Sequence, residues 1–458
     1  MKISINYSSI ICPAVLQEAP NKQIWLSNID LLLGGGHTPI LYLYKPNGPF
    51  SSNFFDVKVL KEALKQVLVL YYSVAGRLRK HDNGKTEINC NGEGVLFIEA
   101  QANSAMVDIN DFTPSQQLWQ LIPVVEYSNG ISSYPLLLLQ VTKFACGGVS
   151  LGIGWHHILA DGVGFTNFMI AWGNIVRGLP IGIPPSFDRT ILSHRVPPTP
   201  TIHHHEYGSP PTLNSSSITT HNPQYQSASK SNNSLKILKI TPAQIKILKV
   251  AISKYTTFEI LTGHIWRCVS EARGLPSKQA TMVYISVEGR SRLCPPAPRG
   301  YFGNAVFHTT TTALAGELIS EPLVKTVKRI HEAIKRVDDE YIRSAIDNLE
   351  EQMIWDNPPS VMKDPQSTCR SPNLKIVSWM SMPFYDAADF GWGRPVYMRA
   401  TNPWEGKGHI VSSPNKDGSL LLLICLETHH IPSFEKLFYG LISDKIGLIG
   451  NSHLRARA

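Results

Sequence analysis

The residues best suited to chemistry lie in the stretch "WHHILADG", which runs from Trp155 to Gly162. Within it, His157 and Asp161 are four residues apart. A histidine titrates near neutral pH, so an imidazole held at a substrate can act as a general base. A nearby carboxylate can orient that imidazole or hold the loop around it. The pattern is equally typical of a hydrogen-bonded core histidine followed by an Asp-Gly turn, so this stretch alone leaves both interpretations open.

A second motif, "DFGWGRP", starts at Asp389. Protein kinases also carry Asp-Phe-Gly, but this chain has no His-Arg-Asp loop and no glycine-rich loop of the kinase pattern Gly-x-Gly-x-x-Gly near its N-terminus, so a kinase is excluded. The structural interpretation is a tight turn that needs Gly391 and Gly393, with Trp392 packed and Asp389 hydrogen-bonded.

Composition and charge narrow the function classes. The chain has 458 residues, which suits two domains, and a net charge of +8 with a pI of about 9.0. Its lysines and arginines are dispersed, so we expect no nucleic-acid partner, whereas a polyanionic small molecule remains possible. The seven cysteines form no CxxC pair. Together with the lack of a distant third ligand for the histidines, this predicts no disulfide framework and no metal site.

Membrane and targeting signals are also missing from the sequence. No apolar run approaches the roughly 20 residues that span a bilayer, and the N-terminus does not resemble a signal peptide. We therefore expect a cytoplasmic protein without membrane insertion.

Strand-like and helical patterns alternate along the chain. The apolar stretch 134–157 predicts two buried strands, and 163–179 has helical spacing, so His157 and Asp161 fall where a buried strand ends and a helix begins. Residues 195–233 are rich in Pro, Ser, Thr and Asn and predict a linker. The run His203 to His205 inside it is interpreted as linker composition rather than as a metal site. The predicted domains are therefore 1–194 and 234–458.

The two motifs together, in a chain of this length, resemble the plant BAHD acyl-CoA-dependent acyltransferases. Further stretches are similar to that family, namely "WLSNIDLL", "VEGRSRL", "GHIWRC" and "YFGNAVF". Within the family, the chain looks closest to the hydroxycinnamoyl-CoA shikimate/quinate hydroxycinnamoyltransferases and their rosmarinate-forming relatives.

The resemblance implies a mechanism and a fold. His157 would be the general base, and Asp161 would point away from the substrate and pair with Arg290. The acyl group would pass directly from coenzyme A to the acceptor in a ternary complex, with acyl-CoA as a co-substrate and with no cofactor or metal. The implied fold is α/β, with two chloramphenicol-acetyltransferase-like domains. Each has a mixed β-sheet flanked by helices, and a long crossover loop joins them in a monomer. Lys254 would contact coenzyme A, and the turn from Asp389 would support the architecture.

Departures from the family pattern concern the acceptor. In "SWMSMP", Ser381 stands where the shikimate/quinate branch has an arginine that grips the acceptor's carboxylate. In "HTPILY", Ile40 replaces a serine, while Thr38 and Tyr42 remain. One alanine also looks inserted before Asp389. We therefore expect an acceptor alcohol other than shikimate or quinate, without a carboxylate. The alternatives are amide formation on an amine or polyamine and, in another class, a non-catalytic binding protein of the same fold.

Overall fold

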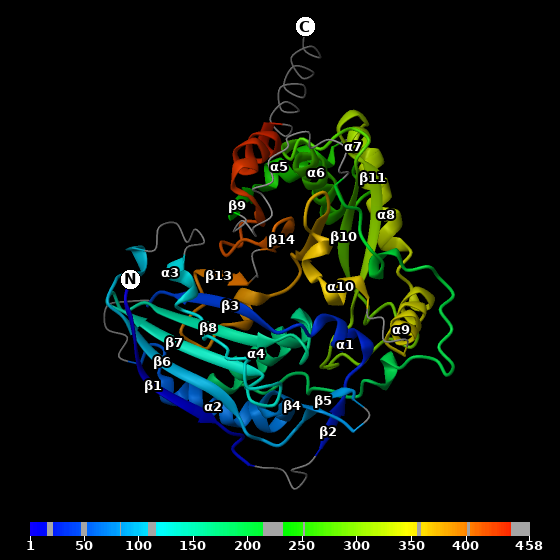
Figure 1. Ribbon diagram of the computed structural model, residues 1–458. Helices are drawn as coiled ribbons and strands as arrows, with labels where there is room; N and C mark the ends of the chain where they lie inside the picture. The colour runs from blue at the N-terminus through cyan, green and yellow to red at the C-terminus, as the bar shows by residue number, and fades with distance from the viewer. Residues whose placement is uncertain are drawn as a thin grey trace, which may run out of the picture. The chain divides into compact units, whose positions relative to one another are not determined.

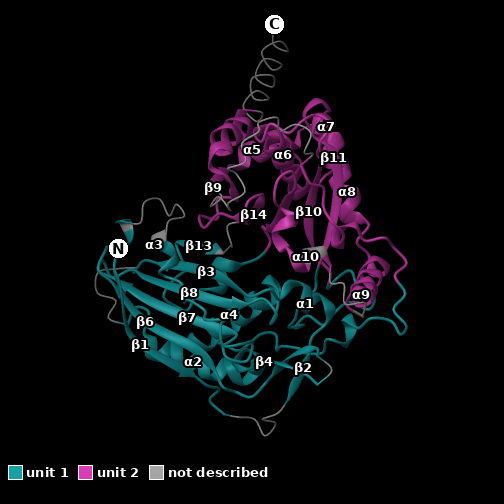
Figure 2. Ribbon diagram, viewed as in Figure 1, with its two compact units in different colours: residues 1–199, 290–306, 382–402 teal, residues 200–289, 307–381, 403–458 magenta. Residues whose placement is uncertain are grey.

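The computed structural model describes residues 1–15, 22–46, 53–82, 84–108, 116–213, 232–250, 252–354, 359–400 and 404–440. The chain forms two compact units (Figure 2). Unit 1 comprises residues 1–199, 290–306 and 382–402, and unit 2 comprises residues 200–289, 307–381 and 403–458. Each unit holds a six-stranded mixed sheet with helices, so the α/β class expected from the sequence is confirmed.

The main sheet of unit 1 has the order β1-β6-β7-β8-β3-β13 (Figure 1). Its strands are β1 (Ile3–Ile11), β3 (His37–Tyr44), β6 (Val95–Ala102), β7 (Leu137–Phe144), β8 (Val149–His156) and β13 (Tyr397–Ala400). Strands β6 and β7 are parallel and the other pairs are antiparallel. Every residue of β8 is buried, which agrees with its unbroken apolar sequence. A Cβ on Gly152 would lie 1.9 Å from the carbonyl oxygen of Leu121, so the chain packs directly on this strand.

Helices and a small sheet complete unit 1. Helix α2 (Val57–Leu70) contacts α4 (Gly162–Val176), and β2 (Gln23–Trp25), β5 (Thr86–Asn89) and β4 (Arg77–Lys80) form a three-stranded sheet. The shorter helices are α1 (Asn28–Leu33), η1 (Tyr72–Ala75), η2 (Met106–Asp108), α3 (Gln116–Trp119), η4 (Thr190–Leu192) and α11 (Phe384–Ala387).

The sheet of unit 2 has the order β11-β10-β12-β14-β15-β9. Its strands are β9 (Asn233–Ile240), β10 (Ala280–Glu288), β11 (Val306–Leu314), β12 (Leu374–Trp379), β14 (Lys407–Ser412) and β15 (Leu420–Glu427). Strands β10, β12 and β14 run parallel, whereas β14, β15 and β9 are antiparallel. The helices are η5 (His205–Tyr207), α5 (Pro242–Lys249), α6 (Thr257–Ala272), α7 (Ala315–Ser320), α8 (Leu323–Lys335), α9 (Asp339–Ile354), α10 (Ser360–Lys363), η8 (Pro365–Thr368) and η9 (Thr428–His430). Among the described residues, no helix is long and apolar enough to cross a membrane.

The units do not follow the chain in two consecutive halves. The segments 290–306 and 382–402 come from the second half of the sequence but pack in unit 1. Strand β13 lies in the second of these segments and pairs with β3, with Met398 opposite Tyr42. The domain limits expected from composition, 1–194 and 234–458, divide the chain into consecutive parts. These limits stay a prediction, because composition does not reveal which strands distant in the sequence pair with each other.

The segment expected to be a linker, 195–233, lies partly outside the described residues, from 214 to 231. Its described part includes buried side chains. The His204 ring bonds through Nδ1 to Glu206 at 2.7 Å and through Nε2 to the Ser344 hydroxyl at 3.0 Å. His204 and Glu206 are 4% and 1% exposed. The central histidine of the His203–His205 run therefore has a structural role, which composition alone did not indicate.

Candidate active site

His157 lies directly after the last residue of β8, and α4 begins five residues later. The backbone N–H of His157 donates to the carbonyl oxygen of Gly36 at 3.1 Å, next to the pairing of His37 with His156 across β3 and β8. The strand end and helix start expected around these residues are where the sequence predicted them. The imidazole is thus carried by a short loop, residues 157–161, between two rigid elements.

Three side chains hold the carbonyl groups of this loop. The Asn304 amide donates to the carbonyl oxygen of His157 at 2.9 Å, and Arg189 donates to that of Leu159 at 3.0 Å. The indole N–H of Trp155 donates to the carbonyl oxygen of Ala160 at 3.0 Å. A loop whose buried carbonyls are bonded in this way is held in one conformation, which fixes the backbone that carries the imidazole.

Asp161 stabilises the far end of the loop. Its Oδ1 accepts from the backbone N–H groups of Val163 and Gly164 at 3.1 and 3.2 Å, so it is the N-cap of α4. Arg290 donates to both carboxylate oxygens, at 2.8 and 3.0 Å, and the Ala305 N–H donates to Oδ2 at 2.9 Å. The structure therefore brings together Asp161 and Arg290, the pair named from the sequence.

The electrostatics of Asp161 follow from these contacts. Burial alone would raise the pKa of this carboxyl group, which is 2% exposed, but Arg290 and the backbone amides outweigh burial and lower the pKa below its usual value. The carboxylate is thus kept charged, and its bonds go to an arginine and to backbone amides.

A second buried ion pair braces the same loop, and the sequence did not reveal it. Asp30 accepts from Arg189 Nε at 2.9 Å and from both the backbone N–H and the side-chain amide of Asn304 at 2.9 Å. Ser27 and Asp30 form a capping box at the start of α1. Serine three residues before an acidic residue could have indicated that helix start, but nothing in the sequence links Asp30 with Arg189.

His156 differs from its neighbour. Its ring is buried and stacks on the Tyr134 ring, with 5.8 Å between the ring centroids. It also contacts the His37 ring edge to face, with 4.7 Å between the ring centroids. Burial lowers the pKa of His156 well below the usual range, with the neighbouring histidines adding to the effect. The backbone N–H of Ile158 donates to its Nδ1 at 3.3 Å. His156 is thus a core residue of the sheet.

The His37 side chain ties β3 to the loop before β7. Its Nδ1 lies 2.7 Å from the Tyr127 hydroxyl, and its Nε2 lies 2.9 Å from the carbonyl oxygen of Pro135. Burial lowers the pKa of His37 to about 4, although the Pro135 bond partly offsets it. His37 is therefore neutral at physiological pH.

One serine has the spacing of a hydrolase nucleophile. Gly148 to Gly152 read Gly-Val-Ser-Leu-Gly, which fits the Gly-x-Ser-x-Gly pattern. Ser150, however, lies inside β8 and its side chain is fully buried. A nucleophilic serine must stand exposed on a sharp strand-to-helix turn, so Ser150 does not have that role.

The residues named for the acceptor occupy two elements. Thr38, Ile40 and Tyr42 alternate on one face of β3, opposite Trp155, Ile153 and Leu151 of β8. Thr38 is half-buried, whereas Ile40 and Tyr42 are 5% and 0% exposed. Ser381 belongs to unit 2 and is exposed in the turn after β12.

The turn at Asp389 attaches β13 to unit 1. Oδ1 of Asp389 accepts from the N–H groups of Gly391 and Gly393 at 2.9 and 3.2 Å, and these glycines have φ values of 95° and 100°, which other residues rarely adopt. The Trp392 ring packs 5.3 Å from that of Phe55, and Phe390 packs 4.7 Å from Trp172. The extra alanine expected before the turn falls at the end of α11, where Ala387 and Ala388 are buried.

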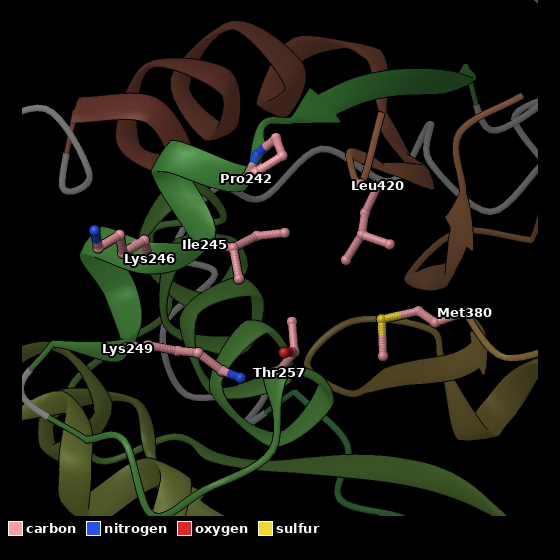
Figure 3. Close-up of a pocket in the computed structure, with 8 residues that line it drawn as sticks. Pro242, Ile245, Lys246, Lys249, Thr257, Met380 and Leu420 are labelled. Carbon is pink, nitrogen blue, oxygen red and sulfur yellow. The ribbon is translucent and has the colours of Figure 1, made fainter. Parts of the chain in front are cut away.

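Unit 2 contains a pocket of about 530 Å³ between α5, the start of α6 and the strand ends (Figure 3). It is lined by Pro242, Ile245, Lys246, Lys249, Thr257, Met380, Gly418 and Leu420. Lys254, named from the sequence, does not line it. That side chain is exposed, with Nζ 5.0 Å from the centre of the Tyr255 ring. Lys246 and Lys249 were missed, although their three-residue spacing on a predicted helix places them on one side.

The part of the chain that the structure describes has one group that could bind a metal ion, formed by Glu427, His429 and His430 of unit 2. Their ligand atoms lie within 4.8 Å of one another. His429 is exposed and the other two are half-buried. This group is separate in sequence from every motif discussed above.

Comparison with known proteins settles the family. A model of the Transferase family matches residues 1–441. This chain belongs to the BAHD acyltransferase family. It is 44% identical over 446 residues to shikimate O-hydroxycinnamoyltransferase of Nicotiana tabacum, covering 96% of this chain and 100% of the relative. It is 43% identical to rosmarinate synthase of Plectranthus scutellarioides, with the same coverage. It is 41% identical to an Avena sativa hydroxycinnamoyl-CoA:5-hydroxyanthranilate N-hydroxycinnamoyltransferase, covering 95% of this chain and 99% of that one.

Solved structures show the same fold. Vinorine synthase superposes with a TM-score of 0.70 at 20% identity, covering 94% of this BAHD chain and 96% of that protein. Fusarium sporotrichioides TRI101, solved with coenzyme A and T-2, superposes with a TM-score of 0.68 at 18% identity, covering 91% and 96%. The BAHD family and its named hydroxycinnamoyltransferase members make this chain an acyl-CoA-dependent acyltransferase that uses small-molecule acceptors.

Proposed function

We propose that this BAHD acyltransferase moves a hydroxycinnamoyl-type group from coenzyme A to an acceptor hydroxyl, with His157 as the general base. The observation that carries the proposal is the fixed loop at residues 157–161, whose ends and carbonyl groups are bonded by Arg290, Asn304 and Arg189. Such bracing suits a base that must be held at one place. Two of the relatives, those of Nicotiana tabacum and Avena sativa, are named as hydroxycinnamoyltransferases, which supports the choice of acyl group.

The proposed reaction needs no covalent enzyme intermediate. The His157 imidazole takes the proton from the acceptor's hydroxyl group while that oxygen attacks the thioester carbonyl carbon. The tetrahedral intermediate then collapses, the carbon–sulfur bond breaks, and the proton goes from the imidazolium to the departing thiolate of coenzyme A. Such proton transfer is worth roughly 10²–10⁴-fold in rate.

We assign the pocket of unit 2 to the phosphate groups of coenzyme A. Lys246 and Lys249 supply two positive charges at its wall, and Thr257 supplies a hydroxyl group. In Figure 3 the Lys249 ammonium group points toward Thr257, whereas the Lys246 ammonium group lies farther from Thr257. Ammonium groups bind phosphate as point charges and need little geometric precision. This assignment replaces Lys254 as the first residue to test.

The proposal for the acceptor rests on Ser381, which stands where the shikimate/quinate branch has an arginine. A guanidinium–carboxylate bond contributes roughly 1.5–3 kcal/mol, so losing the arginine there should weaken shikimate and quinate about 10- to 150-fold. The second candidate is amide formation on an amine, which the N-hydroxycinnamoyltransferase of Avena sativa favours as a precedent at 41% identity.

An acceptor screen with p-coumaroyl-CoA tests these proposals together. Thiol release and product mass are followed for shikimate, a neutral alcohol, an aliphatic amine and anthranilate. His157→Ala serves as the catalytic control. Transfer to at least one acceptor by the native protein, and its loss in the variant, is the expected result. A native protein that transfers to shikimate as well as to its best other acceptor would refute the acceptor proposal while leaving the transferase intact. Failure to release any thiol would contradict the proposed donor.

A further inference from the structure

Three side chains at the end of β15 form a cluster that the proposed reaction does not use. Glu427 is the last residue of β15, and His429 and His430 belong to η9, which follows at once. One ligand atom from each side chain lies within 4.8 Å of the other two. All three residues belong to unit 2. We refer to Glu427, His429 and His430 as the β15 cluster.

The backbone that carries the β15 cluster is fixed by bonds to β9. Glu427 pairs with Asn233 in the register of β15 and β9. The Thr428 N–H and hydroxyl groups both donate to the carbonyl oxygen of Asn232, at 2.8 and 2.6 Å. The same hydroxyl oxygen lies 2.7 Å from that of Ser234. The three ligands therefore stand on backbone with little freedom, which reduces the entropy lost when they converge on one ion.

The distances within the cluster fit a transition-metal ion. Zn²⁺ binds nitrogen and oxygen ligands at about 2.0–2.2 Å in a tetrahedron, which places neighbouring ligand atoms roughly 3.3–3.5 Å apart. Nδ1 of His429 and Oε2 of Glu427 are already 3.5 Å apart. The rings of His429 and His430 lie 3.9 Å apart between centroids. Because His429 is exposed, rotation of its side chain can bring the ligand atoms to these separations without a change in the backbone.

The donor set selects the class of ion. Two imidazoles and one carboxylate suit Zn²⁺, Co²⁺, Ni²⁺ and Cu²⁺, whereas Mg²⁺ and Ca²⁺ prefer oxygen ligands throughout. Three protein ligands leave a coordination position for water. The exposure of His429, with Glu427 and His430 half-buried, gives an ion a path from solvent into the cluster.

One nitrogen atom of the cluster lacks a hydrogen bond. Nδ1 of His430 is enclosed by the protein and has no hydrogen-bond partner among the residues that the structure describes. An enclosed polar atom costs free energy unless a hydrogen bond or a metal ion meets it. An ordinary ion pair between His429 and Glu427 would leave this nitrogen unsatisfied, whereas an ion held between the three side chains can satisfy it.

The charges around the cluster favour a cation. Within the described part of the chain, neither a lysine nor an arginine forms an ion pair with Glu427, whose listed charged neighbour is His429 at 3.5 Å. Arg273 acts on His430 electrostatically, but its guanidinium group is paired with Glu405 at 2.6 Å. A bound cation would therefore meet one carboxylate whose charge no other cation balances.

We propose that the β15 cluster binds one divalent transition-metal ion, represented by Zn²⁺, through Glu427, His429 and His430. The proposal departs from the expectation of no metal site, which rested on the lack of a distant third ligand. Here the three ligands lie within four consecutive positions, so no distant ligand is needed. A bound ion would join the end of β15 to η9 and so stabilise unit 2.

Calorimetric titration with Zn²⁺ tests the site on the full chain, made without a polyhistidine tag and kept reduced. The variants are His429→Gln and His430→Gln. The control is His81→Gln, which changes an exposed histidine directly after β4 in unit 1. Each cluster variant should bind Zn²⁺ at least about 10-fold more weakly, since loss of even an outer-shell partner costs 10- to 100-fold in metal affinity. The control should change less than 2-fold.

Co²⁺ and Mg²⁺ test the class of ion. The native protein and the control should give the visible absorption of Co²⁺ bound with fewer ligands than in water, and the cluster variants should lose most of it. Mg²⁺ at the same concentration should not displace the Co²⁺. Zn²⁺ affinity that is equal in native protein and both cluster variants would overturn the proposal, as would displacement by Mg²⁺.

Folding and activity serve as further readouts. Without metal, His429→Gln should melt within about 2 °C of the native protein, because it is a substitution of an exposed side chain. Zn²⁺ should raise the melting temperature of the native protein more than that of this variant, and an equal rise in both would contradict the site. Acyl transfer without added metal should be the same in His429→Gln and native protein, so failure of the metal site is distinguishable from failure of the proposed transferase reaction.

Discussion

Replacement of Asp161 by asparagine tests the assignment of this residue to structure rather than to proton transfer. Asparagine keeps an oxygen that can accept from Val163 and Gly164, and asparagine is as good an N-cap as aspartate. It loses the charge opposite Arg290 and turns an NH₂ group toward donors of Arg290 or Ala305. The guanidinium group, whose residue is 8% exposed, is then left without its counter-charge.

The expected magnitude follows from burial. Breaking a buried pair by removing one partner costs about 3–5 kcal/mol. For a unit of 150–250 residues, 1 kcal/mol shifts the melting temperature by roughly 2–4 °C. Asp161→Asn should therefore lower the melting transition of unit 1 by about 6–20 °C.

The matched control is Asp56→Asn. Asp56 also caps a helix, accepting from the Lys58 N–H at 2.8 Å, but it has no ion pair among the described residues. It should change the melting temperature by no more than about 2 °C, since an N-cap asparagine replaces aspartate at little cost. Scanning calorimetry of both variants decides the matter. A loss in Asp161→Asn no greater than in Asp56→Asn would refute the reasoning about the buried pair.

Three further predictions concern His157, Lys249 and His37. His157→Ala should lower turnover at least ~10²-fold with an unchanged melting temperature, while His156→Ala should mainly lower stability; near-normal turnover in the first variant would exclude His157 as the base. Lys249→Ala should raise KM for acyl-CoA about 5- to 10-fold at constant kcat, and a rise seen only in Lys254→Ala would disprove the pocket assignment. The pKa of His37 is about 4 when folded, so the unfolded chain binds more protons between pH 6.5 and 4 and the native state should lose roughly 2–3 kcal/mol as pH falls to 4.5. His37→Gln should make that slope smaller in urea titrations, and an unchanged slope would assign the pH dependence to other groups.

Local features of the site could be predicted from the sequence because they depend on neighbours. The apolar run before His157 and the helical spacing after Asp161 are properties of one short stretch, and the structure has the strand end and helix start there. The pairing of Asp161 with Arg290 came from family resemblance, since no local pattern connects residues 129 positions apart.

Long-range contacts could not be predicted in this way. The bonds from Arg189 and Asn304 to Asp30 join residues 159 and 274 positions apart, and each residue taken alone is an ordinary polar side chain. The same limit applies to Lys375 and Lys407, which are neighbours only because β12 and β14 pair in that register. The number of lysines and arginines in a sequence does not show which of them lie close together. Their proximity becomes known only when the pairing of the strands is known.

Strand β13 has a consequence for synthesis of the chain on the ribosome. It covers the edge of β3, yet it consists of residues 397–400, while the other five strands of that sheet lie within the first 156 residues. Until more than 240 further residues have been added, the nascent sheet presents β3 as an open edge, and open edges are templates for pairing with other chains. Arg290 and Asn304 also emerge late, so the buried Asp161 waits without its arginine and Asp30 without Asn304, although Arg189 is already present. Expression of residues 1–194 alone should therefore yield aggregation, and coexpression with the missing strand as a peptide should reduce it.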